Sequence, residues 1–140
     1  TELFPALSAD SRWLAYASNE SGTMEIYVRP FPATATAKWQ VSTAGGTQPT
    51  WSRNGRELFY INGKGEMMSA EIRPGPTFSV GEQQVLFSTA AYLAVTGIHA
   101  YSLSPDDRRF LMLQEGESIQ QSELVLAEHW MQRRLQSSAK

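Results

Sequence analysis

The 140-residue sequence has no cysteine, which excludes disulfide bonds, thiolate metal sites and a cysteine nucleophile. It also lacks an apolar run of about 18 residues, the length that a membrane-spanning helix needs. The formal net charge is only -2 and no run of Lys or Arg occurs, which argues against nucleic acid as a partner. His99 and His129, the two histidines, have no further ligand at metal-binding spacing and are predicted to be half-buried residues at strand ends. No metal or cofactor is expected.

What the sequence does contain is a repeat. The stretch from Pro49 to Tyr60 is similar to the stretch from Pro5 to Tyr16 and to part of the stretch from Ala100 to Met112. Each copy has an apolar run, a tight turn and a second run rich in apolar and aromatic residues. The matched positions are Leu7, Trp51 and Leu103, then Ser8, Ser52 and Ser104, then Asp10, Asn54 and Asp106, and then Arg12, Arg56 and Arg108.

The turn in each copy contains residues that favour a tight reversal of the chain. An Asp or Asn side chain can accept a hydrogen bond from the backbone ahead of it. The next residue, which is Ser11, Gly55 or Asp107, must tolerate a left-handed or turn conformation. Structural turns are therefore predicted around Asp10, Asn54, Gly55 and Asp106.

The spacing of the copies indicates the fold. Trp51 lies 44 residues after Leu7, and Leu103 lies 52 residues after Trp51. Repeats of roughly 40 to 50 residues with about four strand-like runs each are typical of propeller blades. The sequence therefore predicts an all-β fold, a partial β-propeller of about three blades. A loop inserted around residues 90–97 accounts for the longer second spacing.

A single propeller-type domain is predicted over residues 1–140, with blades at about residues 3–44, 46–89 and 98–128. The last blade lacks a convincing fourth strand, and residues 129–140 are interpreted as a short helix or a polar tail. The predicted strands are residues 4–8, 12–18, 25–29, 38–42, 48–52, 56–61, 66–72, 84–88, 100–104, 108–114 and 123–128.

The turn pattern resembles the TolB-like, WD-related propeller repeat, in which an apolar residue and the sequence Ser-Pro-Asp-Gly precede a strand. Ser104-Pro105-Asp106 matches it most closely, and the other two copies depart from it at one or two positions. Nearly the whole chain also resembles the C-terminal end of the propeller that follows many bacterial serine/threonine protein kinases. That likeness is carried by residues 19–22, 25–32, 39–42, 45–49, 51–60 and 123–126, together with Trp130.

In those relatives the kinase is N-terminal and the propeller is a sensing or interaction module, often outside the membrane. The resemblance thus implies a non-catalytic binding module, the C-terminal part of a larger bacterial signalling protein, and an extracytoplasmic location if that protein is a membrane-spanning kinase. The chain itself has no Gly-rich phosphate loop, no His-Arg-Asp loop and no Asp-Phe-Gly, so it is not expected to be an enzyme. The alternative is a propeller fragment of a prolyl-oligopeptidase-like or tricorn-like peptidase.

The repeated arginines are the candidate ligand-facing residues. Equivalent positions in successive blades converge around a propeller axis, so Arg12, Arg56 and Arg108 could line a shared anion site. Alternatively, each arginine bonds the carboxylate of its own turn or caps a strand end. The repeated serines are interpreted as turn residues, because no Gly-x-Ser-x-Gly surrounds them.

Two further groups receive structural interpretations. Asp106 and Asp107 are adjacent and lack the spaced oxygen ligands of a calcium loop. The four tryptophans are predicted to pack between sheets. No catalytic residue is predicted.

Because about three blades leave two open faces, the chain is expected either to self-associate, for example as two chains in a six-bladed ring, or to be the remainder of a longer propeller. The ligand would be a protein or a small molecule.

Overall fold

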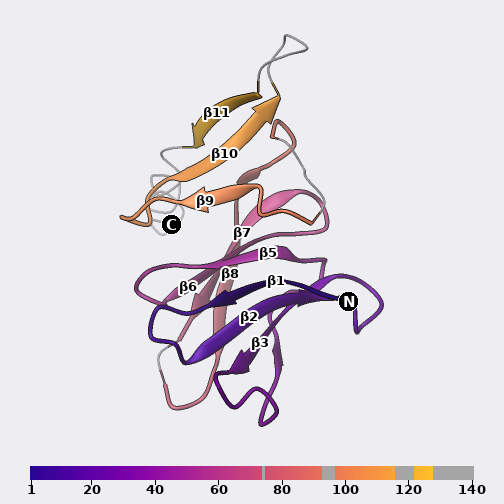
Figure 1. Cartoon of the computed structure of the whole chain (residues 1–140), viewed down its shortest axis with the longest axis vertical. Coiled ribbons are helices and arrows are strands. Elements are labelled where there is room, and N and C mark those ends of the chain that lie inside the picture. The colour runs from indigo at the N-terminus through magenta and orange to yellow at the C-terminus, as the bar shows by residue number, and fades with distance from the viewer. Residues whose placement is uncertain (74, 93–96, 116–121, 128–140) are drawn as a thin grey trace, which may run out of the picture. The chain divides into compact units, whose positions relative to one another are not determined.

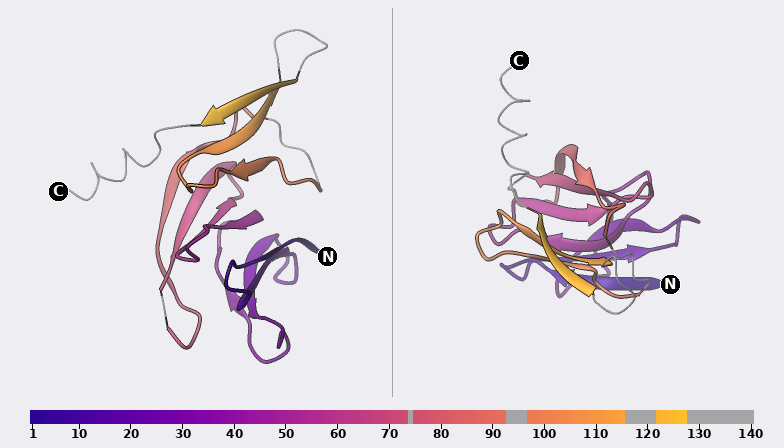
Figure 2. Two further views of the ribbon diagram at one scale, coloured as in Figure 1. Left: turned by 60° about the vertical axis from the view of Figure 1, so that its left-hand side comes forward. Right: turned by 90° about the horizontal axis from the view of Figure 1, so that it is seen from above.

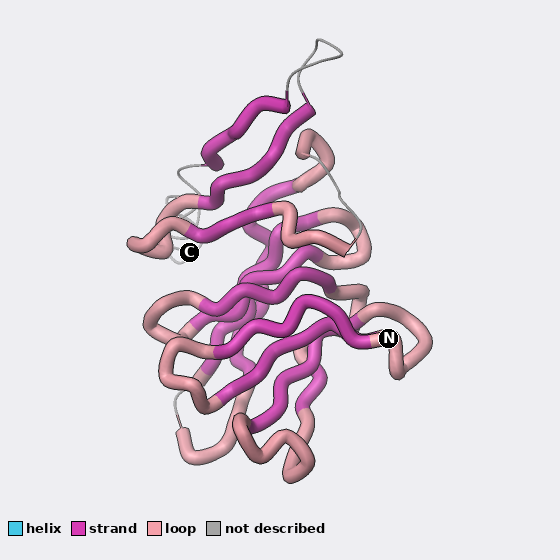
Figure 3. Tube along the Cα trace, viewed as in Figure 1, coloured by secondary structure: helices cyan, strands magenta, loops and turns pink. Residues whose placement is uncertain are grey.

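The computed structural model of the chain describes residues 1–73, 75–92, 97–115 and 122–127, with side chains described as far as Gln114. These residues form eleven β-strands and no helix, which confirms the predicted all-β class (Figures 1 and 3). The strands make three antiparallel sheets. The first two sheets belong to one compact unit, residues 1–89, and the third sheet belongs to a second unit, residues 90–140. The predicted C-terminal helix or tail lies outside the described residues.

The first two sheets are four-stranded meanders in which each strand pairs with the next along the chain. In the first sheet, Leu7 pairs with Leu14. In the second sheet, Trp51 pairs with Leu58 at the same point of the ladder. The strands are β1 (Glu2–Leu7), β2 (Trp13–Ser18), β3 (Glu25–Pro30) and β4 (Trp39–Gln40), followed by β5 (Thr47–Trp51), β6 (Glu57–Ile61), β7 (Glu66–Ile72) and β8 (Val80–Ser88).

The third sheet consists of β9 (Tyr101–Leu103), β10 (Phe110–Glu115) and β11 (Ser122–Ala127), with β10 in the middle. Leu103 pairs with Phe110, which repeats the register of the other two sheets. Three strands are described here against four in each of the others. The described residues thus form the first three strands of a third repeat.

In the first two sheets, β4 and β8 differ most in length from the prediction, and the other strands begin and end within two residues of their predicted bounds. β8 begins at Val80 rather than at residue 84, because Val80 and Gln83 extend the pairing with β7. β4 covers only Trp39–Gln40 rather than residues 38–42, because the Ser42 side chain replaces a backbone partner there. The Ser42 hydroxyl accepts the Ile26 N–H at 2.8 Å, which is a hydrogen bond that a longer strand would have given to a carbonyl.

The hydrophobic core of the first unit lies between the two sheets. The face of the first sheet that carries Ala15 and Ala17 packs against β5 and the apolar residues of the second sheet. The ribbons of the two sheets lie side by side (Figure 2). At its centre, Phe78 lies 5.4, 5.5 and 6.4 Å from the rings of Trp13, Trp39 and Trp51. The core comprises Ala15, Ala17, Ile26, Val28, Val41, Trp51, Leu58, Tyr60, Ala70, Ile72 and Phe78.

Polar bonds also cross between the two sheets. The Trp51 Nε1–H donates to the Ala6 carbonyl at 3.0 Å. The Tyr60 hydroxyl donates to Gln83 Oε1 at 2.7 Å, and Gln83 Nε2 donates to the Val41 carbonyl at 2.9 Å. In both cases the second sheet supplies the side-chain donors and the first sheet, or the loop after it, supplies the carbonyl acceptor, so these bonds hold the two sheets in one register.

Burial of Tyr60 leads to a testable pH dependence. Desolvation, and secondarily the nearby Glu25 carboxylate, raise the pKa of Tyr60 to about 12 from its usual value of 10.0. The folded chain therefore keeps this phenolic proton where the unfolded chain loses it. The free energy of unfolding should fall as the pH rises from about 10 to about 12 and should be unaffected by Tyr60 at lower pH.

Chemical denaturation of the native chain and of Tyr60→Phe at several alkaline pH values would measure this effect. The variant should show a shallower loss of stability across the same window. At neutral pH it should be about 1 kcal/mol less stable, because its hydrogen bond to Gln83 is lost. Identical slopes for the two proteins between about pH 10 and 12 would contradict the assignment.

A second contact between the two sheets joins their loops. Gly63 N donates to the Ala44 carbonyl at 2.9 Å, and the backbones of Gly45 and Gly63 lie so close that a Cβ on Gly45 would be 2.6 Å from Gly63 Cα. The buried carboxylate of Glu25 holds this loop, since it accepts hydrogen bonds from Gly45 N at 3.0 Å and from the Ser42 hydroxyl. Glycine is required at this approach because a side chain would collide with backbone.

The first strands of the two sheets share an irregularity that the sequence does not suggest. Phe4 in β1 and Gln48 in β5 have positive φ values of 56° and 55°. Each lies where the register of its strand shifts by a bulge. A left-handed conformation is uncommon for residues with large side chains. Its occurrence at the same place in both sheets indicates that it shapes this strand of the repeat.

Candidate binding cleft at the turns of the first two sheets

The turns that contain the repeated Ser and Asp/Asn residues have one hydrogen-bond pattern. In the first turn, Asp10 Oδ1 accepts from the Ser8 hydroxyl at 2.7 Å and from Arg12 N at 3.1 Å. The Ser8 oxygen in turn accepts from Trp13 N at 3.0 Å. Ser11, between these residues, has a φ of 57°, as expected for the residue that follows the carboxylate. The serine and the carboxylate are therefore engaged in the turn itself.

The other two turns repeat this arrangement. In the second turn, Asn54 Oδ1 accepts from the Ser52 hydroxyl at 2.9 Å and from Arg56 N at 2.8 Å. In the third turn, Asp106 Oδ1 accepts from the Ser104 hydroxyl and, at 3.2 Å, from Arg108 N. The pKa values of Asp10 and Asp106 are lowered, first of all by the serine hydrogen bond in each case. Both carboxylates therefore stay ionised to lower pH than usual.

The first two turns and the β7–β8 connection enclose a cleft of about 150 Å³. Its walls combine charged and apolar groups, because guanidinium side chains stand beside the indole of Trp13 and the ring of Phe78. The lining residues that carry charge are Asp10, Arg12, Arg56 and Arg73. Three cations and one carboxylate thus surround the cleft in a chain whose net charge is negative.

Arg12 is held in this cleft by two contacts. Its guanidinium carbon lies 5.3 Å from the centroid of the Trp13 ring. One of its terminal nitrogens donates to the Gly75 carbonyl at 3.5 Å. The side chain therefore does not bond the turn carboxylate of Asp10, which was the alternative that the sequence left open. Only its backbone N–H contacts that carboxylate.

Arg56 and Arg73 contribute guanidinium groups with no hydrogen-bond or ion-pair partner among the residues that the structure describes. Their backbones are anchored nonetheless, since Ile72 N donates to the Arg56 carbonyl at 2.8 Å and Arg73 N donates to the Ser79 carbonyl at 3.0 Å. Both side chains are exposed. Arg56 is thus positioned at the cleft without an ion-pair partner among the described residues, whereas Arg73 lies near the Glu71 carboxylate: a Cβ on Gly81 would be 3.0 Å from Arg73 Nε and 2.9 Å from Glu71 Cδ.

The structure therefore brings together two of the three predicted ligand-facing arginines, Arg12 and Arg56. Arg108 belongs to the third sheet, in the other unit, and its place at a shared site stays a prediction. Arg73 was missed by the sequence analysis because it follows β7, outside the repeated turn. The signal available in the sequence was the Arg-Pro-Gly-Pro run at residues 73–76, which predicts a break in the chain beside a cationic residue.

Other groups show no comparable arrangement. In the part of the chain that is described, no three His, Asp or Glu side chains are placed to hold a metal ion. The ring of His99 lies 5.3 Å from that of Tyr101, and His129 lies outside the described residues. Within the described ranges there is no helix long and apolar enough to cross a membrane.

No family model and no curated protein matches the chain by sequence. Solved structures do match it. A protein described as TolB from Agrobacterium tumefaciens has a TM-score of 0.63 and 14% identity, over 93% of this chain and 46% of that one. Oligogalacturonate lyase from Vibrio parahaemolyticus has a TM-score of 0.60 and 12% identity, over 88% of this chain and 35% of that one.

A further structure, an oligogalacturonate lyase in complex with manganese, has a TM-score of 0.56 and 13% identity, over 78% of this chain and 27% of that one. At these identities the likeness defines the fold alone. The fold is that of a β-propeller with TolB-like sheets, as the repeat predicted. The chain spans less than half the length of each of these proteins. The predicted link to kinases is not tested by these likenesses.

Proposed function

We propose that this chain is a non-catalytic binding module and that the cleft between its first two turns receives an anionic group of the ligand. The observation that carries this proposal is the position of Arg12, Arg56 and Arg73 around one cleft. Guanidinium groups bind carboxylates and phosphates through charge-assisted hydrogen bonds. The apolar wall of Trp13 and Phe78 would pack against the uncharged part of the ligand.

The absence of catalysis is part of this proposal. The hydroxyls of Ser8 and Ser52 each donate to a turn oxygen and accept a backbone N–H. A serine nucleophile needs a general base at its hydroxyl. The acceptor at Ser52 is the amide oxygen of Asn54, which is not a base, and the acceptor at Ser8 is the Asp10 carboxylate, a weak base whose pKa is lowered by this same hydrogen bond. The serines are thus committed to holding the turns, and the arginines beside them are suited to binding.

The wider role that we propose is sensing within a bacterial signalling protein, with this module C-terminal to a receptor-type serine/threonine kinase and outside the membrane. The support for this role is the resemblance of the sequence to propellers that follow such kinases. Reading the coding sequence upstream would test it directly. A kinase domain followed by a membrane span is expected, whereas a coding sequence without a kinase would contradict this wider role.

The anion site can be tested by titrating the isotope-labelled chain with inorganic phosphate and with glutarate, and by following amide shifts. Saturable shifts are expected at residues 10–13, 54–56 and 72–73, with dissociation constants in the millimolar range. Arg12→Gln and Arg56→Gln should each weaken binding about fivefold to tenfold, because each removes a charge-assisted hydrogen bond that exposure to solvent partly screens.

Arg53→Gln is the matched control, since Arg53 belongs to the second turn but does not line the cleft. This substitution removes the same charge, and its affinity for the anion should stay within about twofold of that of the native chain. Arg108→Gln would measure any contribution of the third sheet. Unsaturable shifts, or equal losses in Arg53→Gln and Arg56→Gln, would reject a specific anion site and leave only the general effect of charge.

A further inference from the structure

The first sheet has a second face, on the side away from the second sheet. We call it the outer face and define it by Leu7, Leu14, Tyr16 and Arg29. Residues alternate between the two faces of a strand, so Leu14 and Tyr16 are opposite in direction to the core residues Ala15 and Ala17. A hollow of about 400 Å³ is formed there by Glu2, Leu3, Pro5, Leu14, Tyr16, Arg29 and Thr34.

The outer face exposes apolar side chains at its β1 edge, whereas Tyr16 on β2 is 5% exposed. Leu7 is 44% exposed and Leu3, in the hollow, is 36% exposed. Arranged on neighbouring strands, these side chains and Leu14 form a continuous apolar surface rather than scattered residues. Contiguous apolar patches of this kind mark interaction sites on soluble proteins.

The repeat indicates what kind of surface would cover it. Leu7 and Leu14 pair in the first sheet as Trp51 and Leu58 pair in the second. Trp51 and Leu58 are 8% and 0% exposed because the first sheet covers them. The outer face is therefore the same docking surface one repeat earlier, and the established interface between the first two sheets continues there without its partner.

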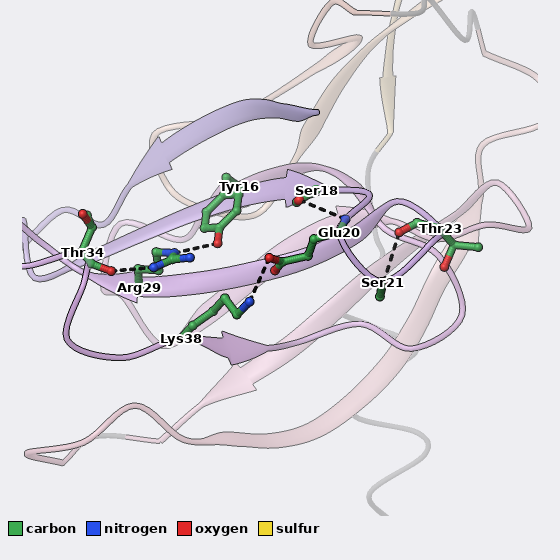
Figure 4. Close-up of polar contacts among 8 residues, drawn as sticks. All are labelled: Tyr16, Ser18, Glu20, Ser21, Thr23, Arg29, Thr34 and Lys38. Carbon is green, nitrogen blue, oxygen red and sulfur yellow. Dashed lines mark hydrogen bonds and ion pairs between the residues drawn. The ribbon is translucent and has the colours of Figure 1, made fainter.

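The polar groups of the outer face agree with this equivalence. Tyr16 corresponds to Tyr60, whose hydroxyl reaches the first sheet through Gln83. Arg29 Nε donates to the Tyr16 hydroxyl and Arg29 Nη1 donates to the Thr34 carbonyl, each at 2.8 Å (Figure 4). Arg29 Nη2 has no hydrogen-bond partner among the described residues. It is thus available for a carbonyl of the covering sheet, which is the role that Gln83 Nε2 has at Val41.

Two of the nearby charges, Lys38 and Glu20, pair with each other, and Arg29 and Glu2 are the charges that line the hollow itself. Lys38 Nζ lies 2.8 Å from Glu20 Oε2 (Figure 4). The same nitrogen is 5.3 Å from the centroid of the Tyr27 ring. Covering the neighbouring apolar surface would therefore not isolate the lysine, and it would bury Arg29 together with Glu2, which carries the opposite charge.

The third sheet carries the complementary kind of surface. Leu111 pairs with Ser102 as Ala15 pairs with Ala6, so Leu111 corresponds to the position that faces the next sheet in the first repeat. Whereas Ala15 is 0% exposed, Leu111 is 39% exposed. Leu126 and Leu124 lie opposite Leu111 and Leu113 in the ladder, so that leucine occupies all four of these positions.

We propose that the outer face of one chain docks against the Leu111 side of the third sheet of a second copy, and that the reciprocal contact forms at the same time. A second copy is the occupant that supplies both missing surfaces together. Three sheets from each chain give six, which lies within the range of about four to eight that closes a propeller. The contact is head-to-tail and closes on itself, so the assembly stops at two chains.

Light scattering coupled to size-exclusion chromatography of the full chain would test this proposal. The native chain should have twice the mass of one chain at micromolar concentrations. Leu7→Glu and Leu111→Glu should each raise the dissociation constant of the dimer about a hundredfold, because each places a charge in an apolar contact. Val85→Glu, at a residue that is 52% exposed on β8 of the second sheet, is the matched control and should remain a dimer.

Mixing Leu7→Glu with Leu111→Glu provides the sharpest outcome. In a mixed dimer both substitutions fall in one junction and the other junction is native, so the mixture should regain dimer that neither variant forms alone. A native chain that is folded and monomeric would overturn the proposal. The outer face would then be a contact surface for propeller sheets other than those of a second copy. If Leu111→Glu left the dimer intact, the proposal would be overturned in favour of a contact between the outer faces of two chains. Assemblies of more than two chains would overturn the closed ring.

Discussion

Replacing Phe78 with alanine is expected to lower the free energy of unfolding by about 3 to 5 kcal/mol. Phe78 is 5% exposed and lies within 6.4 Å of the ring centroids of three tryptophans, one of which belongs to its own sheet and two to the first. Its removal leaves a cavity at the contact between the sheets, which rigid aromatic neighbours cannot fill. Urea unfolding followed by tryptophan fluorescence would measure the loss.

Phe31→Ala is the control for this experiment, because Phe31 is 43% exposed. Its cost should stay below about 1 kcal/mol. Since Phe78 also lines the cleft, Phe78→Ala should weaken anion binding even where the chain remains folded. Equal costs for the two substitutions would mean that the two sheets do not depend on this aromatic cluster.

Replacing Gly45 with alanine is expected to cost about 2 to 5 kcal/mol, from two separate causes. Gly45 has a φ of 84°, which strains any residue with a side chain, and the new Cβ would lie 2.6 Å from Gly63 Cα. The obstacle is backbone rather than a flexible side chain, so the loops of the two sheets must separate. Loss of the Gly45 hydrogen bond to the buried Glu25 would follow.

Gly55→Ala separates these two causes. Gly55 also has a positive φ, of 68°, but a Cβ there would meet no atom within 4 Å. The equivalent residues, Ser11 and Asp107, adopt φ values of 57° and 56° with side chains present. The substitution should therefore cost about 1 kcal/mol. If Gly45→Ala proved no more destabilising than Gly55→Ala, close approach of the two loops would not contribute to stability.

The repeat made much of the fold predictable. The Asp10, Asn54 and Asp106 copies fixed the spacing of the strands, and aromatic and β-branched runs such as β3 and β6 were found close to their true positions. The length of β4 could not be predicted, because it depends on the Ser42 hydroxyl taking the Ile26 N–H. That bond forms only after β3 and its following loop have been brought together.

The candidate site was predictable only in part, for a related reason. Arg12 and Arg56 occupy equivalent turn positions, so their convergence follows from the repeat. Arg73 lies after β7 and enters the cleft through the connection to β8, whose path is set by tertiary packing of Phe78. The partner of Arg12, the Gly75 carbonyl, is 63 residues away in sequence and gives no local signal.

The bulge that β1 and β5 share shows that two repeats can have the same backbone conformation with different residues. Phe4 and Gln48 have nothing in common as side chains, yet their φ values differ by a single degree. The backbone conformation at this position is thus the same in the two sheets although the residues differ, just as solved structures at 12% to 14% identity share the fold where no family model matches the sequence. A search that compares backbone torsion angles would therefore recognise repeats whose residue types have diverged.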